Sequence, residues 1–394
     1  MPSSGTRGTS CLAAIFGLNA CLIISIFVGE FSKTHSMLKH FFLFLSLLLG
    51  STVYAQTGDG DSAARAALEE VVSEVEGHYA GFFDKVTPVT RASYEAMVAE
   101  LRTGVSSGNV DASIGKYIGW FRDLHLSVFL GGKRLVSHEK KPVNYADSMI
   151  YNPSFFSGPV DGDCYLIRIP SMRVRDGARQ FIAKAVRRFK RSGCPYLIID
   201  LRGNGGGADG VYNPLVELAY DHAGVQTGAY FRNTGKNRAF LQEGMKENKK
   251  IVKAIAACAD KPDTLVILRE DNLRSFRKVS PYPTRIAVII DNRIASNAEN
   301  LILALQSISD RVILYGRDPT LGCVDYVNPR PIAIPSRDMV VHVPTTRSSR
   351  LPEHPVDPKG IGPEVFIPLP LPEELTDDID TWVQWVAEDI KRSK

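Results

Sequence analysis

The chain has 394 residues, of which 44% are hydrophobic, 23% charged and 9% aromatic. This composition is typical of a globular protein and excludes a disordered, collagen-like or disulfide-framework chain. The length suits two or three structural units, or one α/β core with accessory segments. Because 47 basic and 43 acidic side chains leave a net charge of only +4, the charge indicates no nucleic-acid or membrane-surface binding.

Residues 37–55 have the pattern of a secretory signal peptide. A basic segment, an apolar run and a small-residue cleavage pattern ending at Ala55 follow one another there. We therefore expect an exported protein, periplasmic or extracellular, whose mature chain begins at Gln56. Residues 1–36 would be an upstream extension or an anchor, because the uncharged residues 11–29 are long enough to span a membrane. Membrane association would then come only from an uncleaved N-terminus.

Four cysteines follow the signal segment, and their spacing contains no Cys-x-x-Cys and no Cys/His pattern of a zinc site. We therefore expect no bound metal. Cys164 and Cys194 each begin an apolar run, so these two could form a disulfide in an oxidising compartment if their strands are neighbours.

Apolar spacing divides the rest of the chain into a helical region, a core and a closing helix. Residues 56–122 have helical spacing, whereas residues 123–370 alternate apolar strands with helices. Within this core, residues 221–280 are polar and basic and form an excursion, in which residues 237–258 are expected to be one helix. Residues 371–394 contain the closing helix. This pattern predicts an α/β fold.

A glycine-rich segment follows the buried strand that residues 196–201 predict. Residues 203–207 include four glycines, so the backbone can turn tightly and expose N–H groups. Such a loop can hold the oxyanion of acyl transfer or a phosphate, or it can be only a tight turn. Gly203, Gly205 and Ala208 also fit a loose dinucleotide fingerprint, which keeps nucleotide binding as an alternative.

Ser296 begins a predicted helix directly after the apolar strand at residues 285–291. The residues from Ser296 to Glu299 have the S-x-x-E pattern of a capping box, in which the serine hydroxyl only satisfies a helix N–H group. The same position suits a nucleophile. A sharp strand-to-helix turn would expose the hydroxyl, and the positive helix end would face the charge that develops on the attacked carbonyl.

His125 and Glu353 are the residues that could activate such a serine. Residues 124–130 alternate as a strand and place His125 opposite the leucine face. A histidine on a polar strand face and a glutamate in a loop are each more often only solvated. Together with Ser296 they would form a Ser-His-Glu set, in which His125 is the general base and Glu353 fixes its tautomer.

The order of these motifs resembles the C-terminal processing (tail-specific) protease family. Four segments carry the resemblance: residues 200–207, 295–299, 320–322 and 360–365. The resemblance implies a crotonase-like spiral β-sheet core flanked by helices, with Ser296 as the nucleophile. It also implies that the oxyanion is held by the amides of Asn297 and of Gly206, or Gly205.

The family has two branches that differ in the catalytic base. One pairs the serine with a lysine directly after a Thr-x-Gly, where this chain has Cys323. Because a cysteine cannot replace an amine base, the resemblance points to the other branch, which is similar to the tricorn protease core and uses a histidine and a glutamate. His125 and Glu353 fall at the corresponding places, but Leu124 stands where a small residue is usual, and Glu353 lies seven residues before Gly360.

Substrate recognition by a PDZ domain, which many relatives use, is not expected here. Residues 131–163, between the histidine segment and the next core strand, are too few for that domain. The excursion at residues 221–280 is the better candidate for a lid or substrate groove. We therefore predict an exported serine peptidase that acts on polypeptides and uses no metal or organic cofactor. The alternative is a non-catalytic protein that binds a peptide or an apolar ligand on the same fold.

Overall fold

The computed structural model describes residues 60–135, 154–370 and 379–392. From Asp61 onward these residues belong to one compact unit. The predicted extension and signal peptide, residues 1–55, lie outside the described part. Among the described helices, none combines the length and the apolar character that a membrane crossing requires.

The first of two large sheets has six strands in the order β14-β11-β10-β5-β4-β3. Neighbouring strands are parallel, except that β3 is antiparallel to β4. The strands are β3 (Phe156–Pro159), β4 (Cys164–Arg168), β5 (Tyr196–Asp200), β10 (Arg285–Ile289), β11 (Val312–Gly316) and β14 (Val365–Phe366). Because β4, β5 and β10 are buried on both faces, continuous apolar runs predict them.

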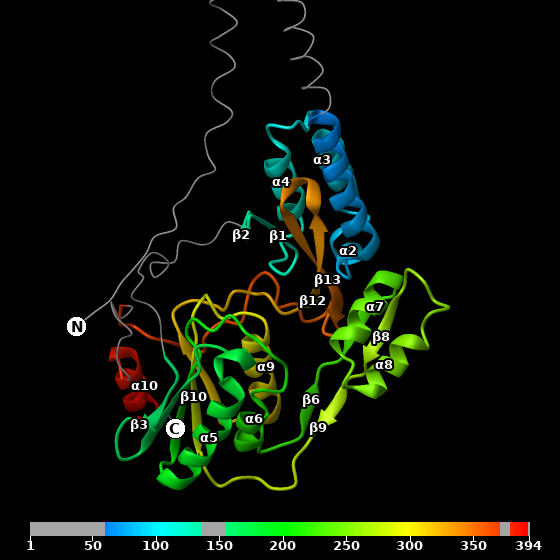
Figure 1. The fold of residues 1–394 in the computed structure, drawn as a ribbon. Helices are drawn as coiled ribbons and strands as arrows, with labels where there is room; N and C mark the ends of the chain where they lie inside the picture. The colour runs from blue at the N-terminus through cyan, green and yellow to red at the C-terminus, as the bar shows by residue number, and fades with distance from the viewer. Residues whose placement is uncertain (1–59, 136–153, 371–378, 393–394) are drawn as a thin grey trace, which may run out of the picture. The chain divides into compact units, whose positions relative to one another are not determined.

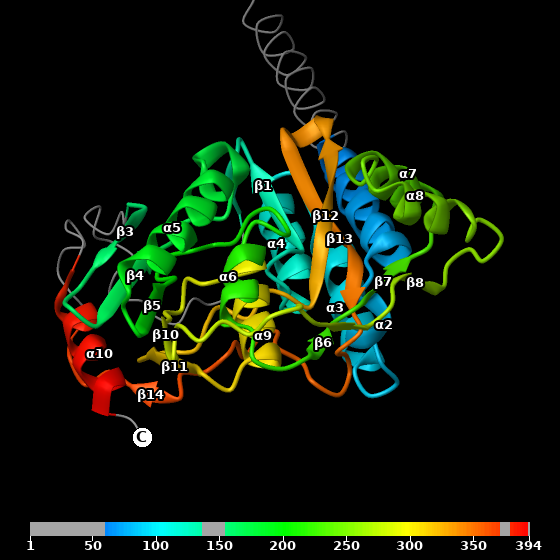
Figure 2. The ribbon, with the colours of Figure 1, turned by 90° about the horizontal axis from the view of Figure 1, so that it is seen from below.

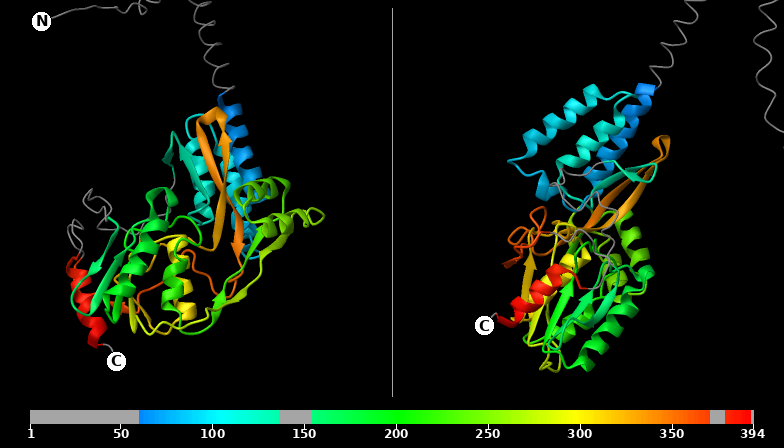
Figure 3. Two further views of the ribbon diagram at one scale, coloured as in Figure 1. Left: turned by 60° about the horizontal axis from the view of Figure 1, so that its bottom comes forward. Right: turned by 90° about the vertical axis from the view of Figure 1, so that its left-hand side faces the viewer.

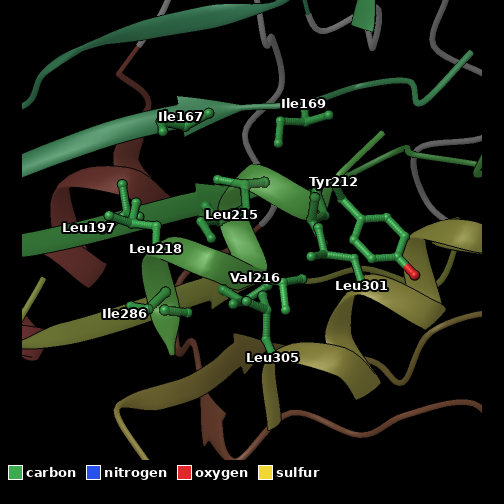
Figure 4. Packing of buried hydrophobic residues seen from close by; sticks show 14 of the residues in the cluster. Ile167, Ile169, Leu197, Tyr212, Leu215, Val216, Leu218, Ile286, Leu301 and Leu305 are labelled. Carbon is green, nitrogen blue, oxygen red and sulfur yellow. The ribbon is translucent and has the colours of Figure 1, made fainter. Parts of the chain in front are cut away.

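Helices cover both faces of this sheet (Figure 2). They are α5 (Ala178–Ser192), α6 (Asn213–Ala219), α9 (Asn297–Ile308) and α10 (Thr381–Arg392). On one face Leu197 and Ile286 of the strands share a buried cluster with Leu215 of α6 and Leu301 of α9 (Figure 4). On the other face the fully buried Trp382 of α10 packs against the sheet.

The second large sheet is antiparallel, in the order β2-β1-β13-β7-β8, with β12 paired to β13. Its strands are β1 (Ser127–Leu130), β2 (Lys133–Arg134), β7 (Ala229–Arg232), β8 (Leu265–Arg269), β12 (Tyr326–Ile334) and β13 (Met339–Ser348). The N-terminal helices lie beside β1, β12 and β13 (Figures 1 and 3), and their apolar side chains share a buried cluster with these strands. These helices are residues 60–78, α2 (Phe82–Lys85), α3 (Arg91–Gly104) and α4 (Val110–Trp120).

The predicted excursion at residues 221–280 extends the second sheet through β7 and β8. It also contains a two-stranded sheet of β6 (Gly224–Gln226) and β9 (Asn272–Arg274). The prediction of a single helix at residues 237–258 is wrong, because two helices lie there, α7 (Gly235–Gly244) and α8 (Lys249–Ala256). Gly244 ends the first, and the Asn248 side chain caps the second by accepting from the Ile251 N–H. Two 3₁₀ helices lie elsewhere, at Val174–Asp176 and Pro335–Arg337.

The disulfide considered for Cys164 and Cys194 is not formed. Both residues are free and buried, and they belong to clusters on opposite faces of the first sheet. Between β1 and β4 the described residues form only β2 and β3, so the described chain contains no PDZ domain; residues 136–153 lie outside the description.

A buried ionic network joins β5 to the start of α10. The Asp200 carboxylate accepts from Arg168 Nε at 2.8 Å and from Arg202 Nη2 at 2.7 Å. Both arginines also contact Asp380, which accepts from Arg202 Nη2 at 2.6 Å. Burial by itself raises the pKa of Asp200, but Arg202 and Arg168 outweigh burial and lower the pKa to about 2.

The substitution Asp200→Asn should therefore destabilise the fold strongly. It removes the charge that compensates two buried guanidinium groups, and breaking a buried pair from one side costs about 3–5 kcal/mol. Urea unfolding would measure the loss. The control is Glu388→Gln, which removes an exposed pair with Arg392 on α10 and should cost less than about 0.5 kcal/mol. Equal losses in the two variants would contradict the role of the network.

Candidate active site

The Glu299 carboxylate joins the start of α9 to the loop at residues 320–323. Its Oε2 accepts from the backbone N–H of Ser296 (3.0 Å) and of Cys323 (2.9 Å). Its Oε1 accepts from the Thr320 hydroxyl (2.6 Å) and the Gly322 N–H (2.8 Å). Burial raises the pKa of Glu299, although all four donors favour the charged form. The carboxylate thus holds Cys323 next to Ser296, whose N–H also donates to the Cys323 carbonyl at 2.9 Å.

Ser296 is held in a strained backbone conformation at the turn between β10 and α9. The capping-box pattern predicted from the sequence is present, but φ is 58° and ψ is −124°, whereas an N-cap residue is usually extended. A non-glycine residue held at such angles costs of order 1–3 kcal/mol, which the surrounding contacts must offset. Its side chain is only partly buried. A serine exposed on a strained strand-to-helix turn is typical of a nucleophile.

Gly206 lies directly against this serine. A Cβ added at Gly206 would lie 2.9 Å from each of the Ala295 carbonyl oxygen, the Asn297 nitrogen and the Ser296 Cβ. Gly206 also has φ of +91°, a conformation that side-chain-bearing residues rarely adopt. The glycine loop after β5 and the serine after β10 therefore meet at the same edge of the sheet, as the family resemblance implies.

The amide of Gly206, however, does not face an empty site. It donates to Asn204 Oδ1 at 2.8 Å, so the N–H that the family resemblance assigns to the oxyanion already has an acceptor. Among the residues that the structure describes, the N–H groups of Asn297, Gly205 and Gly207 have no hydrogen-bond acceptor. The N–H groups of the expected donors Asn297 and Gly205 are therefore free to bind an oxyanion. Gly207 offers a third such N–H group.

The loop does not have the geometry of a dinucleotide site. That geometry needs a helix to begin at the glycines, with its N-terminus facing the phosphates. Here α6 begins only at Asn213, and Gly207 instead forms a parallel bridge with Met172. This loop geometry therefore does not support nucleotide binding.

His125 lies in a bend before β1 and not on the predicted strand, because β1 begins only at Ser127. The Asp123 side chain causes this: its Oδ1 accepts the backbone N–H of His125 at 2.8 Å, and its Oδ2 accepts from the Tyr79 hydroxyl at 2.8 Å. Burial lowers the pKa of His125, and the opposing effects of Asp123 and of the Tyr326 carbonyl do not cancel it. The ring is therefore held neutral, as a general base requires.

Cys323 contacts both the histidine and the serine. Its Sγ is 3.2 Å from His125 Nδ1, and no hydrogen bond joins Ser296 to His125 within the described residues. Burial, reinforced by the nearby carboxylates of Asp357, Asp123 and Glu299, raises the pKa of the Cys323 thiol well above its usual range. Cys323 is consequently a neutral thiol and a poor nucleophile.

The structure does not bring Glu353 to His125. The Glu353 side chain is exposed on a turn, and it makes no hydrogen bond or ion pair to any residue in the described ranges. The carboxylate near His125 is that of Asp123 instead, and those near Cys323 are the buried Asp357, Asp123 and Glu299. Asp357 accepts the Val324 N–H at 2.7 Å. Burial, with the neighbouring Asp123 and Asp325 carboxylates, raises the pKa of Asp357 to about 8.

Sequence reasoning missed three residues of this site. Asn204 was visible only as part of the glycine motif, although its side chain also donates to the Ile169 carbonyl and so anchors the loop to β4. Glu299 was visible only as a capping residue. No sequence motif marks Asp357, because its raised pKa comes from burial beside segments that are distant in sequence.

The chain is a serine-type peptidase, as its family shows. The sequence model of peptidase family S41 matches residues 163–367, which is more than half of the chain, so the chain belongs to this family. A search of curated proteins found no matching sequence.

Solved structures share the fold at low sequence identity. A protein from Parabacteroides merdae is 13% identical with a TM-score of 0.52, and the match covers 77% of this chain and 89% of that one. Mature CPAF is 13% identical with a TM-score of 0.57, and the match covers 84% and 96% of the two chains. Mature CPAF complexed with lactacystin is 12% identical with a TM-score of 0.56, covering 84% and 97%.

The pKa of Asp357 predicts a pH dependence of stability. The unfolded chain releases this proton near pH 4, whereas the folded protein keeps it up to about pH 8. The folded state thus binds more protons between these values, so the contribution of this group to the free energy of unfolding falls as pH rises from about 4 to about 8. Asp357→Asn stays neutral and should remove that fall, as measured by urea unfolding at several pH values. Parallel pH profiles of the two proteins would contradict it.

Proposed function

We propose that the protein hydrolyses peptide bonds of polypeptides with Ser296 as the nucleophile and His125 as the general base. The observation that carries this proposal is the contact between Gly206 and the strained Ser296, beside the unoccupied N–H of Asn297. This N–H lies at the positive end of α9, where a developing oxyanion would be stabilised. Gly205 and Gly207 supply the further N–H groups that such a site needs.

In this mechanism Ser296 Oγ attacks the scissile carbonyl while His125 takes its proton. The oxyanion collapses as the peptide C–N bond breaks, and His125 returns the proton to the leaving amine. A water molecule that His125 deprotonates then attacks the acyl-enzyme, which releases the second product and restores the Ser296 hydroxyl. Before the first step, the His125 ring must leave the Cys323 thiol and form a hydrogen bond with the Ser296 hydroxyl. Hydrogen bonds of this kind often form only in the substrate complex.

Asp123 is the positioning residue that the geometry favours for His125. It accepts the backbone N–H of the histidine and, on its other oxygen, the Tyr79 hydroxyl, so the bend that carries the ring is tied to the N-terminal helices. In the Ser-His-Glu set of the family resemblance Glu353 has a different role, which is to fix the tautomer of the His125 ring. Glu353 could take it only after an inward movement of its exposed turn.

The Ser296→Ala variant should lose peptide cleavage while remaining folded. Removal of the attacking oxygen should lower kcat/KM by more than about a thousandfold. The lost helix cap should cost only about 1 kcal/mol. The assay is cleavage of a mixed peptide library by the full chain and by the variant, with products identified by mass spectrometry and folding checked by urea unfolding. Unchanged cleavage by the variant would refute the assignment of Ser296.

Two further variants in the same assay separate the base from its partner. His125→Gln should lower kcat/KM by at least about 100-fold, because proton transfer is lost. Glu353→Gln should leave cleavage near the wild-type rate. A loss with Glu353→Gln as large as that with His125→Gln would instead support the Ser-His-Glu set.

A second candidate function is peptide binding without catalysis. The contact between Cys323 and His125 Nδ1 favours it, because the expected base is bonded to a thiol and not to the serine. A folded protein that binds library peptides but cleaves none would support this function.

We also propose that the chain is exported and cleaved after Ala55. The support is the three-part pattern of residues 37–55. The intact mass of the protein isolated from its source should match a chain that begins at Gln56. A mass that includes residues 1–55 would refute cleavage and favour an anchored protein.

A further inference from the structure

A pocket is lined by residues of the 221–280 segment and of α9, the helix that Ser296 begins. Its walls include residues from the end of the glycine loop, from β6, β8 and β9, from α9, and from the turn after β13. The lining residues used below are Asp209, Arg269, Arg274, Asn300, Leu303 and Arg350.

Two direct connections place this pocket next to Ser296. The Asn300 N–H donates to the Ser296 carbonyl at 3.1 Å, and Asn300 lies about 6 Å further along α9 at 1.5 Å per residue. Asn297 Nδ2 donates to the Ala208 carbonyl at 2.6 Å, and the next residue, Asp209, lines the pocket. A polypeptide chain attacked by Ser296 would therefore pass the pocket within a few residues.

The lining carries three guanidinium groups and one carboxylate, which leaves the pocket positive. Arg274 Nη2 donates to the neutral Asn213 Oδ1 at 2.7 Å, and in the described parts of the chain Arg274 has no carboxylate partner. Arg269 Nη1 lies 3.9 Å from Asp209 Oδ2, and both side chains are exposed, so this pair is weak.

Arg350 is the third cation, and its charge is only partly compensated. Its Nη2 donates to Asp325 Oδ1 at 2.8 Å, while Asp325 Oδ2 is already used by the N–H groups of Val356 and Asp357. The buried Nε–H of Arg350 has no acceptor among the described residues. Because that Nε–H is buried, the cations open to a ligand are Arg269, with only a weak carboxylate pair, and Arg274, with none among the described residues, and these two favour an additional anionic partner.

We propose that this pocket binds an acidic side chain of the substrate, so that the peptidase prefers Glu or Asp close to the scissile bond. Arginine binds carboxylates through charge-assisted, often paired hydrogen bonds, and Leu303 provides an apolar wall for the side-chain methylenes. The α9 residues of the pocket lie about 6–18 Å from Ser296 along the helix. Since an extended peptide spans about 3.3 Å per residue, the acidic residue lies about two to five residues from the bond that is cleaved. This inference rests on the proposed peptidase function.

The test compares peptides that differ only by Glu or Gln in this range, chosen from library cleavage sites. The wild-type protein should cleave the Glu peptide about 10-fold faster in kcat/KM, as expected for one charge-assisted contact. Arg274→Gln and Arg269→Gln should each reduce that ratio toward one. Arg277→Gln is the matched control, because Arg277 is exposed on the segment after β9 and does not line the pocket. A ratio near one in the wild type, or an unchanged ratio in both pocket variants, would overturn the proposal.

Two additional measurements identify the carboxylate that is recognised and separate its binding from catalysis. The same peptides with a C-terminal acid or amide distinguish a side-chain carboxylate from a terminal one, and a preference that follows only the terminus would overturn the proposal. Binding of fluorescein-labelled Glu and Gln peptides to the Ser296→Ala protein tests the pocket without catalysis. If the wild type cleaves no peptide but the variant binds the Glu peptide more tightly, the peptidase function fails while the pocket assignment survives. Equal binding of both peptides would refute the pocket assignment.

Discussion

One buried carboxylate, that of Glu299, sets the geometry on which the active-site region depends. With four hydrogen bonds it fixes the backbone of Ser296 to the loop that carries Cys323, although these segments are separated by a whole helix and the strand β11. A carboxylate with four donors can remain buried because its lone pairs are satisfied. The strain at Ser296 is sustained by the same contacts, since a residue in this conformation persists only where its surroundings over-determine it.

The parallel sheet brings the other half of the site to the same edge. Strands β5 and β10 are neighbours in register, so the glycine loop that follows one meets the serine turn that follows the other. Asp291 reinforces this meeting, because its carboxylate accepts the Gly203 N–H at 3.0 Å. Loops at the carboxyl ends of parallel strands commonly form binding sites for this reason. The buried pairs of Asp200 with Arg168 and Arg202 lie at the same end of β5.

The second sheet and its helices supply the histidine and one wall of the neighbouring pocket. His125 precedes β1, and its bend is held through Asp123 by Tyr79 of the N-terminal region. Arg350 follows β13, and the segment between β5 and β10 contributes Arg269 and Arg274. The candidate active site and the neighbouring pocket are therefore built from parts that different regions of the chain contribute. The thiol of Cys323 joins two of these regions, because its Sγ contacts His125 Nδ1 while its backbone is held to the start of α9.

The sequence by itself determined the features that local physics controls. Continuous apolar runs predict β5 and β10, the S-x-x-E pattern predicts the start of α9 at Ser296, and repeated glycines predict the tight loop at Gly206. The tertiary structure alone decided which polar groups pair. His125 lies before its predicted strand because its N–H bonds to Asp123, and the Gly206 N–H bonds to Asn204. Glu353 is exposed to solvent, whereas Asp357 is buried. The reason is physical: periodicity and turn preference are properties of neighbouring residues, whereas a hydrogen-bond partner and a desolvated charge depend on segments that meet only after folding.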